Sequence, residues 1–122
     1  MDSMELIKKI VKTLDDKKAE DIRVIKVSDI TSLGDYFVIA SADNVTKVKS
    51  LVDEVEYQTK QMGRYPSKIE KDTSAQWILL DYQDVITHIF YREAREFYDL
   101  ERLWADGEEL SLDDFLKGED ND

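Results

Sequence analysis

The sequence feature that most constrains the fold is a pair of strand-like segments joined by a very short bend. Residues 77–81 are WILLD and residues 85–91 are VITHIFY, and both segments are rich in β-branched and aromatic side chains. Only Tyr82, Gln83 and Asp84 lie between them. Because so short a connection joins only antiparallel neighbours, the two segments predict a β-hairpin.

The register of this hairpin depends on which residues make the bend. If Tyr82 and Gln83 form a two-residue turn, the facing pairs are Asp81 with Asp84, Leu79 with Ile86, and Trp77 with His88. A three-residue bend would shift this register. Alternation along each strand places all six side chains on one face, where the two opposed carboxylates repel each other unless a partner supplies Lys or Arg. Two interpretations stay open: packing under a helix, the more common environment of such apolar residues, and a surface that binds a partner.

The remaining segments predict one sheet with helices around it. Helices are expected at residues 3–17, 44–63 and 92–104, and further strands at residues 22–27, 35–41 and 67–70. Asn44 suits the N-cap of the second helix, and Gly63 suits its C-terminal stop. The unbroken apolar run in residues 35–41 indicates a strand covered on both faces. This order predicts an α+β (mixed α/β) fold, a single mixed sheet of about five strands flanked by helices.

The last predicted helix carries two kinds of large side chain. At about 100° per residue, one arc holds the apolar side chains of Phe97, Leu100, Leu103 and Trp104. We expect this stripe to pack on the sheet. Tyr98 lies outside the arc and Glu101 at its edge, so both are candidates for recognition by a partner. Ordinary packing at the edge of the sheet is the alternative for Tyr98.

The charge of the chain is strongly acidic and unevenly distributed. Acidic residues outnumber basic ones by 28 to 17, and the segment from residue 93 onward holds twelve of these acids but only three basic residues. General nucleic-acid or anionic-membrane binding needs clustered Lys and Arg, so the balance favours a specific partner with a basic surface. We predict one domain over residues 1–106 and an acidic C-terminal tail over residues 107–122, with one short helix capped by Ser111.

No pattern in the chain indicates catalysis or a bound cofactor. The four glycines are far apart, which excludes a glycine-rich phosphate loop, and His88 has no nucleophile elbow to support a catalytic triad. The absence of cysteine excludes thiolate chemistry, and the acids lack the spacing of a calcium loop. We therefore predict no catalytic, cofactor-binding or metal-binding residues. The chain shows neither a long apolar stretch nor a signal-peptide pattern, so we expect a soluble cytoplasmic protein.

The segment WILLDYQDVITHIFYREAREFYDLERLWAD resembles the signature of the Iojap/RsfS family of ribosomal silencing factors. The matching positions are Trp77, Asp81, Tyr82, Asp84, His88, Phe90, Arg95, Phe97, Tyr98, Leu100, Glu101, Leu103, Trp104 and Asp106. The resemblance extends over about residues 3–106. Gln83 departs from the family pattern, which has Gly there, and Gly34 stands where Thr or Ala is common.

The resemblance implies a nucleotidyltransferase-like fold and a function without transferase chemistry. Family members are dimers that bind the large ribosomal subunit through ribosomal protein L-fourteen and block the small subunit from joining, which represses translation when nutrients are scarce. Carried onto this chain, the resemblance and the patterns above give a partner-binding set of Trp77, Leu79, Asp81, Asp84, His88, Tyr98 and Glu101. The acids would pair with Lys or Arg of the partner.

Two other functions are open on the sequence. The first is a nucleotidyltransferase relative that acts on a nucleotide or tRNA with magnesium. Ala42-Asp43-Asn44 stands where active transferases have a Gly-Ser turn and paired acids, which counts against this enzyme. The second is a purely structural dimer module in a larger assembly.

Overall fold

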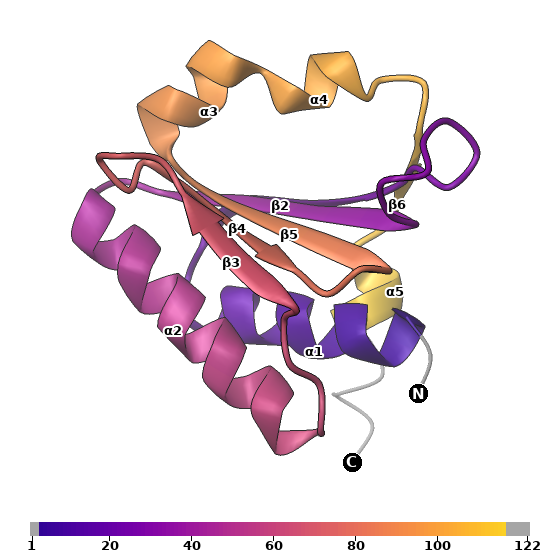
Figure 1. Cartoon of the computed structure of the whole chain (residues 1–122), viewed down its shortest axis with the longest axis horizontal. Coiled ribbons are helices and arrows are strands. Elements are labelled where there is room, and N and C mark those ends of the chain that lie inside the picture. The colour runs from indigo at the N-terminus through magenta and orange to yellow at the C-terminus, as the bar shows by residue number, and fades with distance from the viewer. Residues whose placement is uncertain (1–2, 117–122) are drawn as a thin grey trace.

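The structure, a computed structural model, describes residues 3–116 of the 122-residue chain (Figure 1). The elements are α1 (Ser3–Asp16), β1 (Glu20–Lys26), β2 (Tyr36–Ala42), α2 (Val45–Gln61), β3 (Lys68–Lys71), β4 (Trp77–Asp81), β5 (Val85–Tyr91), α3 (Arg92–Tyr98), α4 (Leu100–Leu103), β6 (Glu108–Leu110) and α5 (Asp113–Leu116). The strands form one sheet in the order β3-β4-β5-β2-β1-β6. The central β2–β5 pair is parallel and the other pairs are antiparallel. The predicted mixed α+β sheet is confirmed, with six strands instead of about five.

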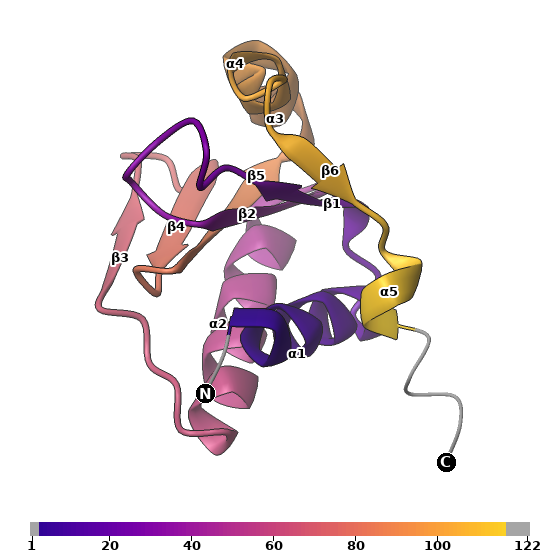
Figure 2. The same ribbon diagram turned by 90° about the vertical axis from the view of Figure 1, so that its right-hand side faces the viewer.

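Helices cover both faces of this sheet. Figure 2 shows α1 and α2 on one side and α3 and α4 on the other. The larger cluster of buried apolar side chains lies on the α1–α2 side and includes Leu6, Ile10, Leu51, Leu80 and Ile89. A smaller cluster on the α3–α4 side includes Phe37, Ile39, Ile86, Phe90 and Leu100. The central strand β2 contributes to both clusters, as its apolar run predicts.

The ends of α2 follow the predicted chemistry. Asn44 Oδ1 accepts a hydrogen bond from the Lys47 backbone N–H at 2.7 Å, which satisfies one of the free donors of the first turn. Gly63, just after the helix, has φ of +86°, a conformation that glycine adopts without steric cost. The predictions of Asn44 as N-cap and of Gly63 as C-terminal stop are confirmed.

The β4–β5 hairpin forms, but the predicted register is wrong by two residues. The facing pairs are Asp81 with Ile86, Leu79 with His88, and Trp77 with Phe90. The bend is at Gln83 and Asp84, because the Tyr82 N–H donates to the Val85 carbonyl at 2.9 Å and Gln83 adopts a φ of +78°. Asp81 stabilises this bend by accepting the Gln83 N–H at 2.7 Å. A shift of two residues preserves alternation, so Trp77, Leu79, Asp81, Ile86 and His88 share a face as predicted, and Asp84 moves into the turn.

The predicted helix over residues 92–104 is interrupted at Asp99, whose φ of +50° lies in the left-handed region. A non-glycine residue in this region costs about 1–2 kcal/mol, and Asp is among the residues that tolerate it best. The interruption changes which side chains face the sheet. Leu100 is buried and Trp104 packs on the smaller cluster, whereas Phe97 is 82% and Leu103 73% exposed. The prediction of a four-residue core stripe is therefore wrong for Phe97 and Leu103.

The segment after Gly107 contributes a strand that the sequence did not predict. β6 pairs with the edge strand β1, and Phe115 of α5 is buried in the larger cluster. Gly107 permits the close approach, since a Cβ there would lie 2.6 Å from Ile25 Cγ2 and 2.8 Å from the Lys26 carbonyl oxygen. Residues 108–116 of the segment predicted to be an acidic tail thus pack on the domain. Residues 117–122 of that predicted tail lie outside the described residues.

Candidate functional site

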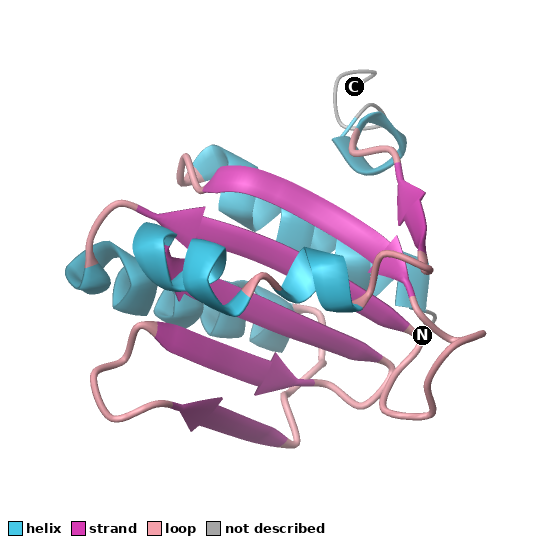
Figure 3. Cartoon of the chain, turned by 90° about the horizontal axis from the view of Figure 1, so that it is seen from above, coloured by secondary structure: helices cyan, strands magenta, loops and turns pink. Residues whose placement is uncertain are grey.

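The α3–α4 side of the sheet carries a connected group of aromatic rings. Seen from above, the ribbons of α3 and α4 lie over the middle strands and not over those of β3 and β4 (Figure 3). Trp77 of β4 is central to the group: its ring centroid lies 4.7 Å from that of Tyr98, 5.0 Å from Phe90 and 5.9 Å from His88. We call this side of the sheet the aromatic face. It consists of the surface around Phe37, Trp77, His88, Phe90, Tyr98 and Trp104, with the α3–α4 segment.

A groove of about 300 Å³ opens on the aromatic face. Its lining is mostly apolar and aromatic and includes Leu33, Phe37, Trp77, Leu79, Ile86, His88, Leu100 and Trp104, with Lys68, Glu70 and Asp81 as charged residues. Three large apolar side chains on or beside this face are strongly exposed, namely Leu33, Phe97 and Leu103. Exposed large apolar side chains beside an apolar groove are typical of surfaces that bind a partner.

His88 lies at the floor of the groove as a neutral donor. Burial lowers its pKa from the usual 6.5 to about 3, so the ring is uncharged at neutral pH. The Trp77 indole N–H donates to His88 Nδ1 at 3.1 Å, which places the single ring proton on Nε2. Within residues 3–116, Nε2 has no hydrogen-bond partner. The buried, uncharged ring packs edge-on against Phe37, with the centroids 4.9 Å apart, and does not have the environment of a general base.

Asp84, one of the seven predicted site residues, lies away from the groove. Its carboxylate accepts hydrogen bonds from Ser3 Oγ and Arg64 Nη2, each at 2.7 Å, on the side covered by α1 and α2. Burial alone would raise the pKa of Asp84, but these two hydrogen bonds outweigh it and the net pKa is lowered. Asp84 therefore joins the start of α1 to the segment after α2.

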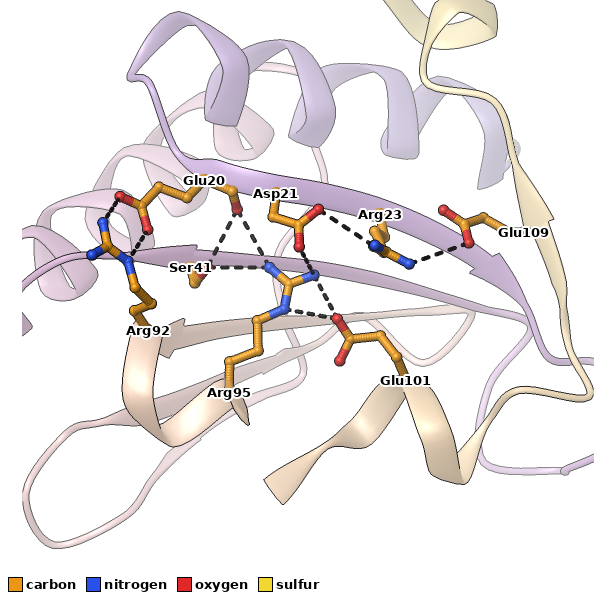
Figure 4. A network of polar contacts seen from close by, with 8 residues as sticks. All are labelled: Glu20, Asp21, Arg23, Ser41, Arg92, Arg95, Glu101 and Glu109. Carbon is orange, nitrogen blue, oxygen red and sulfur yellow. Dashed lines mark hydrogen bonds and ion pairs between the residues drawn. The ribbon is translucent and has the colours of Figure 1, made fainter. Parts of the chain in front are cut away.

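Glu101 is also engaged inside the protein. Its Oε2 lies 2.6 Å from Nη2 of the buried Arg95 and accepts a hydrogen bond from Arg95 Nε at 2.8 Å. Figure 4 shows this pair as part of a network that joins α3 and α4 to β1 and β2. The structure thus brings five of the seven predicted residues together on the aromatic face, namely Trp77, Leu79, Asp81, His88 and Tyr98, and places Asp84 and Glu101 in internal ion pairs.

A second hollow, of about 460 Å³, lies over the polar network. The guanidinium groups that line it already have carboxylate partners: Arg92 pairs with Glu20, and Arg23 with Asp21 and Glu109. An anionic ligand would have to displace these internal acids. The apolar groove is the better candidate for a binding surface.

Sequence reasoning missed the three exposed apolar side chains of the aromatic face, Leu33, Phe97 and Leu103. A large apolar residue in the Ser32-Leu33-Gly34 turn is one signal that could have indicated surface recognition. For Phe97 and Leu103, the signal was Asp99, which interrupts the helical run with a residue type that accepts positive φ. Among residues 3–116 there is no group of three His, Cys, Asp or Glu side chains that could hold a metal ion. Nor does that part of the chain contain a helix long and apolar enough to cross a membrane.

Comparison with known proteins agrees with the fold. The family model described as "Ribosomal silencing factor during starvation" matches residues 1–122. The ribosomal silencing factor RsfS of Bacillus subtilis is 33% identical over 113 residues, which cover 93% of this chain and 96% of that protein. RsfS of Zymomonas mobilis is 39% identical over 104 residues, covering 85% of this chain and 78% of that protein.

A crystal structure of a protein from Chromobacterium violaceum has the same fold. It superposes with a TM-score of 0.82 at 32% identity, and the match covers 86% of this chain and 88% of that one. The family match spans the whole sequence, and the motif from Trp77 to Asp106 includes Trp77, His88 and Trp104 of the groove lining. The chain belongs to the family of ribosomal silencing factors, RsfS.

Proposed function

We propose that this chain is a ribosomal silencing factor that binds the large ribosomal subunit through ribosomal protein L-fourteen. Bound there, it blocks association with the small subunit and represses translation under nutrient limitation. The aromatic face is the surface that makes the contact. Family membership supports the ribosomal role, and the surface itself supports the place of contact.

The observation that carries this proposal is the apolar groove together with the exposed apolar side chains of the loop and helices around it. Leu33 is 69% exposed, and Phe97 and Leu103 are more exposed still. Burying such side chains against a partner contributes roughly 25 cal/mol for each Å² of apolar surface removed from water. Aromatic residues in the centre of a contact surface are also the type that dominates measured binding energies. The aromatic face combines both properties.

Charge supports a basic partner. The chain has a net charge of −11, and Asp81 lies at the edge of the groove. Complementary charge raises the association rate and orients the partner, and it weakens as salt increases. In this proposal Trp77, Leu79, Asp81 and Tyr98 contact the partner directly, and the buried His88 supports them from the floor of the groove. Asp84 and Glu101 support binding indirectly, through the internal ion pairs that hold the surrounding elements.

The proposed mechanism is steric and requires no catalysis by the chain. A neutral, buried His88 suits a contact surface, where a charged ring would have to be desolvated. We also propose that the protein acts in the cytoplasm as a homodimer, as the family resemblance implies. Sedimentation velocity of the purified chain tests the dimer independently of ribosome binding.

The experiment that tests the function is co-sedimentation with isolated large subunits, followed by a subunit-joining assay. We expect the wild-type chain to sediment with large subunits and to reduce joining in proportion to occupancy. Asp81→Lys places a positive charge at the groove and should weaken binding about tenfold or more at physiological salt. Asp53→Lys, at an exposed position of α2, makes the same charge change away from the face and should leave binding within about threefold.

Two results would contradict the proposal. The ribosomal role fails if the wild-type chain does not sediment with large subunits. The assignment of the aromatic face fails if Asp81→Lys and Asp53→Lys weaken binding equally. Incubation with labelled nucleoside triphosphates and magnesium tests the enzymatic alternative, for which turnover by the wild-type chain would be positive evidence.

A further inference from the structure

The interruption of the last helix needs a tertiary explanation. α3 ends at Tyr98 and α4 begins at Leu100, and Asp99 between them has a φ of +50°. The apolar spacing of residues 92–104 favours one continuous helix, so local sequence preference does not cause the bend. A left-handed non-glycine residue persists only where the surrounding structure holds it in place.

Arg95 supplies the contact that holds the bend (Figure 4). The residue is only 6% exposed, yet its guanidinium group has partners from three other elements. Nη1 donates to Ser41 Oγ of β2 at 3.1 Å and lies 3.4 Å from the Glu20 carbonyl oxygen of β1. Nη2 lies 3.6 Å from an Asp21 carboxylate oxygen, and Nε donates to Glu101 of α4 at 2.8 Å. One side chain of α3 therefore joins α4 to the two strands beneath it.

The Arg95–Glu101 pair is compatible only with a bent segment. In a straight helix, two residues six positions apart lie about 120° apart around the axis and about 9 Å apart along it. Side chains meet across a helix surface when they are three or four positions apart, not six. The ion pair and the left-handed Asp99 therefore stabilise each other, and loss of either favours the straight helix.

The bend determines what the aromatic face presents. With the bend, Leu100 is buried while Phe97 and Leu103 lie in solvent. It also brings the Tyr98 ring to 4.7 Å from that of Trp77. In a straight helix, Phe97 and Leu103 would share the core-facing arc with Leu100, and Tyr98 would point elsewhere.

We propose that Arg95 is a positioning residue for the aromatic face: it holds the α3–α4 bend on β1 and β2, and the bend places Tyr98 on Trp77 and keeps Phe97 and Leu103 exposed. The role of Arg95 in binding rests on the function proposed above, whereas its role in the bend does not. Because Arg95 is buried, it acts on a partner only through the residues that it positions.

The first arm of the test needs no partner. In the full-length protein, NMR should give a nuclear Overhauser effect between the rings of Trp77 and Tyr98, which lie in contact. Arg95→Lys keeps the charge but loses the planar fork that bonds three elements at once. We expect this variant and Glu101→Ala to lose the Trp77–Tyr98 effect while core signals from α1 and α2 stay in place.

The matched control is Arg92→Ala. Arg92 is on the same helix and also pairs with a carboxylate, that of Glu20, but the pair is on the surface and does not involve α4. This variant should keep the ring contact. If Arg95→Lys does not fold, Glu101→Ala decides. A ring contact that persists in a folded variant without the Arg95–Glu101 pair would overturn the proposal.

The second arm measures affinity for isolated large subunits. Arg95→Lys and Glu101→Ala should bind about tenfold more weakly than wild type, and Arg92→Ala within about threefold of it. Loss of the ring contact with unchanged affinity would overturn the positioning role. If the wild-type chain itself does not bind, the proposed function fails, and the NMR comparison alone still decides whether Arg95 holds the bend.

Discussion

The two faces of the sheet differ in how completely they bury their apolar side chains. On the α1–α2 face, the largest residues of the cluster, such as Leu6, Ile10 and Leu80, are fully buried. On the aromatic face, the cluster is smaller, a groove is open, and Phe97 and Leu103 are mostly exposed. The ion pairs differ as well, since Asp84 on the first face joins helix ends while Arg95 on the second holds a bend. One face is closed by its two helices, and the other leaves apolar surface in contact with solvent.

The neighbouring residues Leu79 and Leu80 give the largest expected contrast between the faces. Leu80 is fully buried on the α1–α2 face, and Leu79 lines the groove on the aromatic face. We expect Leu80→Ala to lower the free energy of unfolding by about 2–5 kcal/mol, because it leaves a cavity in the larger cluster. Leu79→Ala should cost about 1 kcal/mol or less. Urea denaturation of both variants measures the difference, and equal costs would contradict the distinction.

Asp84 and Asp81 test whether a carboxylate on the α1–α2 face contributes more to stability than one on the aromatic face. Asp84→Ala removes the acceptor of Ser3 and Arg64 and should lower the free energy of unfolding by about 1–3 kcal/mol at pH 7. Asp81→Ala removes one turn hydrogen bond and should cost about 1 kcal/mol or less. Because the pKa of Asp84 is lowered in the folded state, its contribution is present above the usual 3.8 and is lost as pH falls through the folded value.

Urea titrations at pH 7 and pH 3 measure this contribution. The Asp84→Ala variant should differ less from wild type at pH 3 than at pH 7. A cost for Asp81→Ala that equals or exceeds that for Asp84→Ala would contradict the placement of the two carboxylates.

His88 should make the free energy of unfolding decrease in acid. Its folded pKa of about 3 lies below the usual 6.5, so the unfolded chain takes up the proton first as pH falls. Stability from this residue is complete above about pH 6.5 and decreases towards pH 3. Between pH 7 and pH 5 we expect a loss of about 2 kcal/mol from this group. His88→Gln, which stays neutral, should lose this part of the pH dependence in urea titrations, and an unchanged dependence would contradict a buried neutral ring.

Phe97 gives the smallest expected effect on stability. Phe97→Ser replaces a side chain that is 82% exposed, so the free energy of unfolding should change by about 0.5 kcal/mol or less. Its affinity for large subunits should nevertheless fall. Tyr57→Ser, at an exposed aromatic residue of α2, is the control and should change neither quantity. A large loss of stability in Phe97→Ser would place this residue in the core after all.

Local patterns predicted the elements and the faces of the sheet. Alternation in WILLD separates Leu79 from Leu80 correctly, and capping chemistry identified Asn44 and Gly63 at the ends of α2. These features depend on residues close in sequence, which is why one sequence was enough to identify them.

Features that depend on distant residues were missed. The bend at Asp99 depends on contacts of Arg95 with Glu20 and Ser41, which are 75 and 54 positions away along the chain. The hairpin register depends on a left-handed Gln83 and on the Asp84 carbonyl, which accepts the N–H of Asp35 just before β2. The pairing of β6 with β1 depends on the close approach of the chain at Gly107 to Ile25 and Lys26. None of these contacts follows from helical or strand periodicity.

The most direct test of the aromatic face as the ribosome-binding surface compares Leu79→Lys with Ile69→Lys. Both positions are in strands. Ile69 of β3 is paired with Leu80 and shares its face of the sheet, so the side chains of Leu79 and Ile69 lie on opposite faces. The measurement is the dissociation constant for isolated large subunits at physiological salt. We predict that Leu79→Lys weakens binding about tenfold or more, because it places a charge in an apolar contact, and that Ile69→Lys stays within about threefold of wild type. Equal effects of the two folded variants, or a larger effect of Ile69→Lys, would contradict the account.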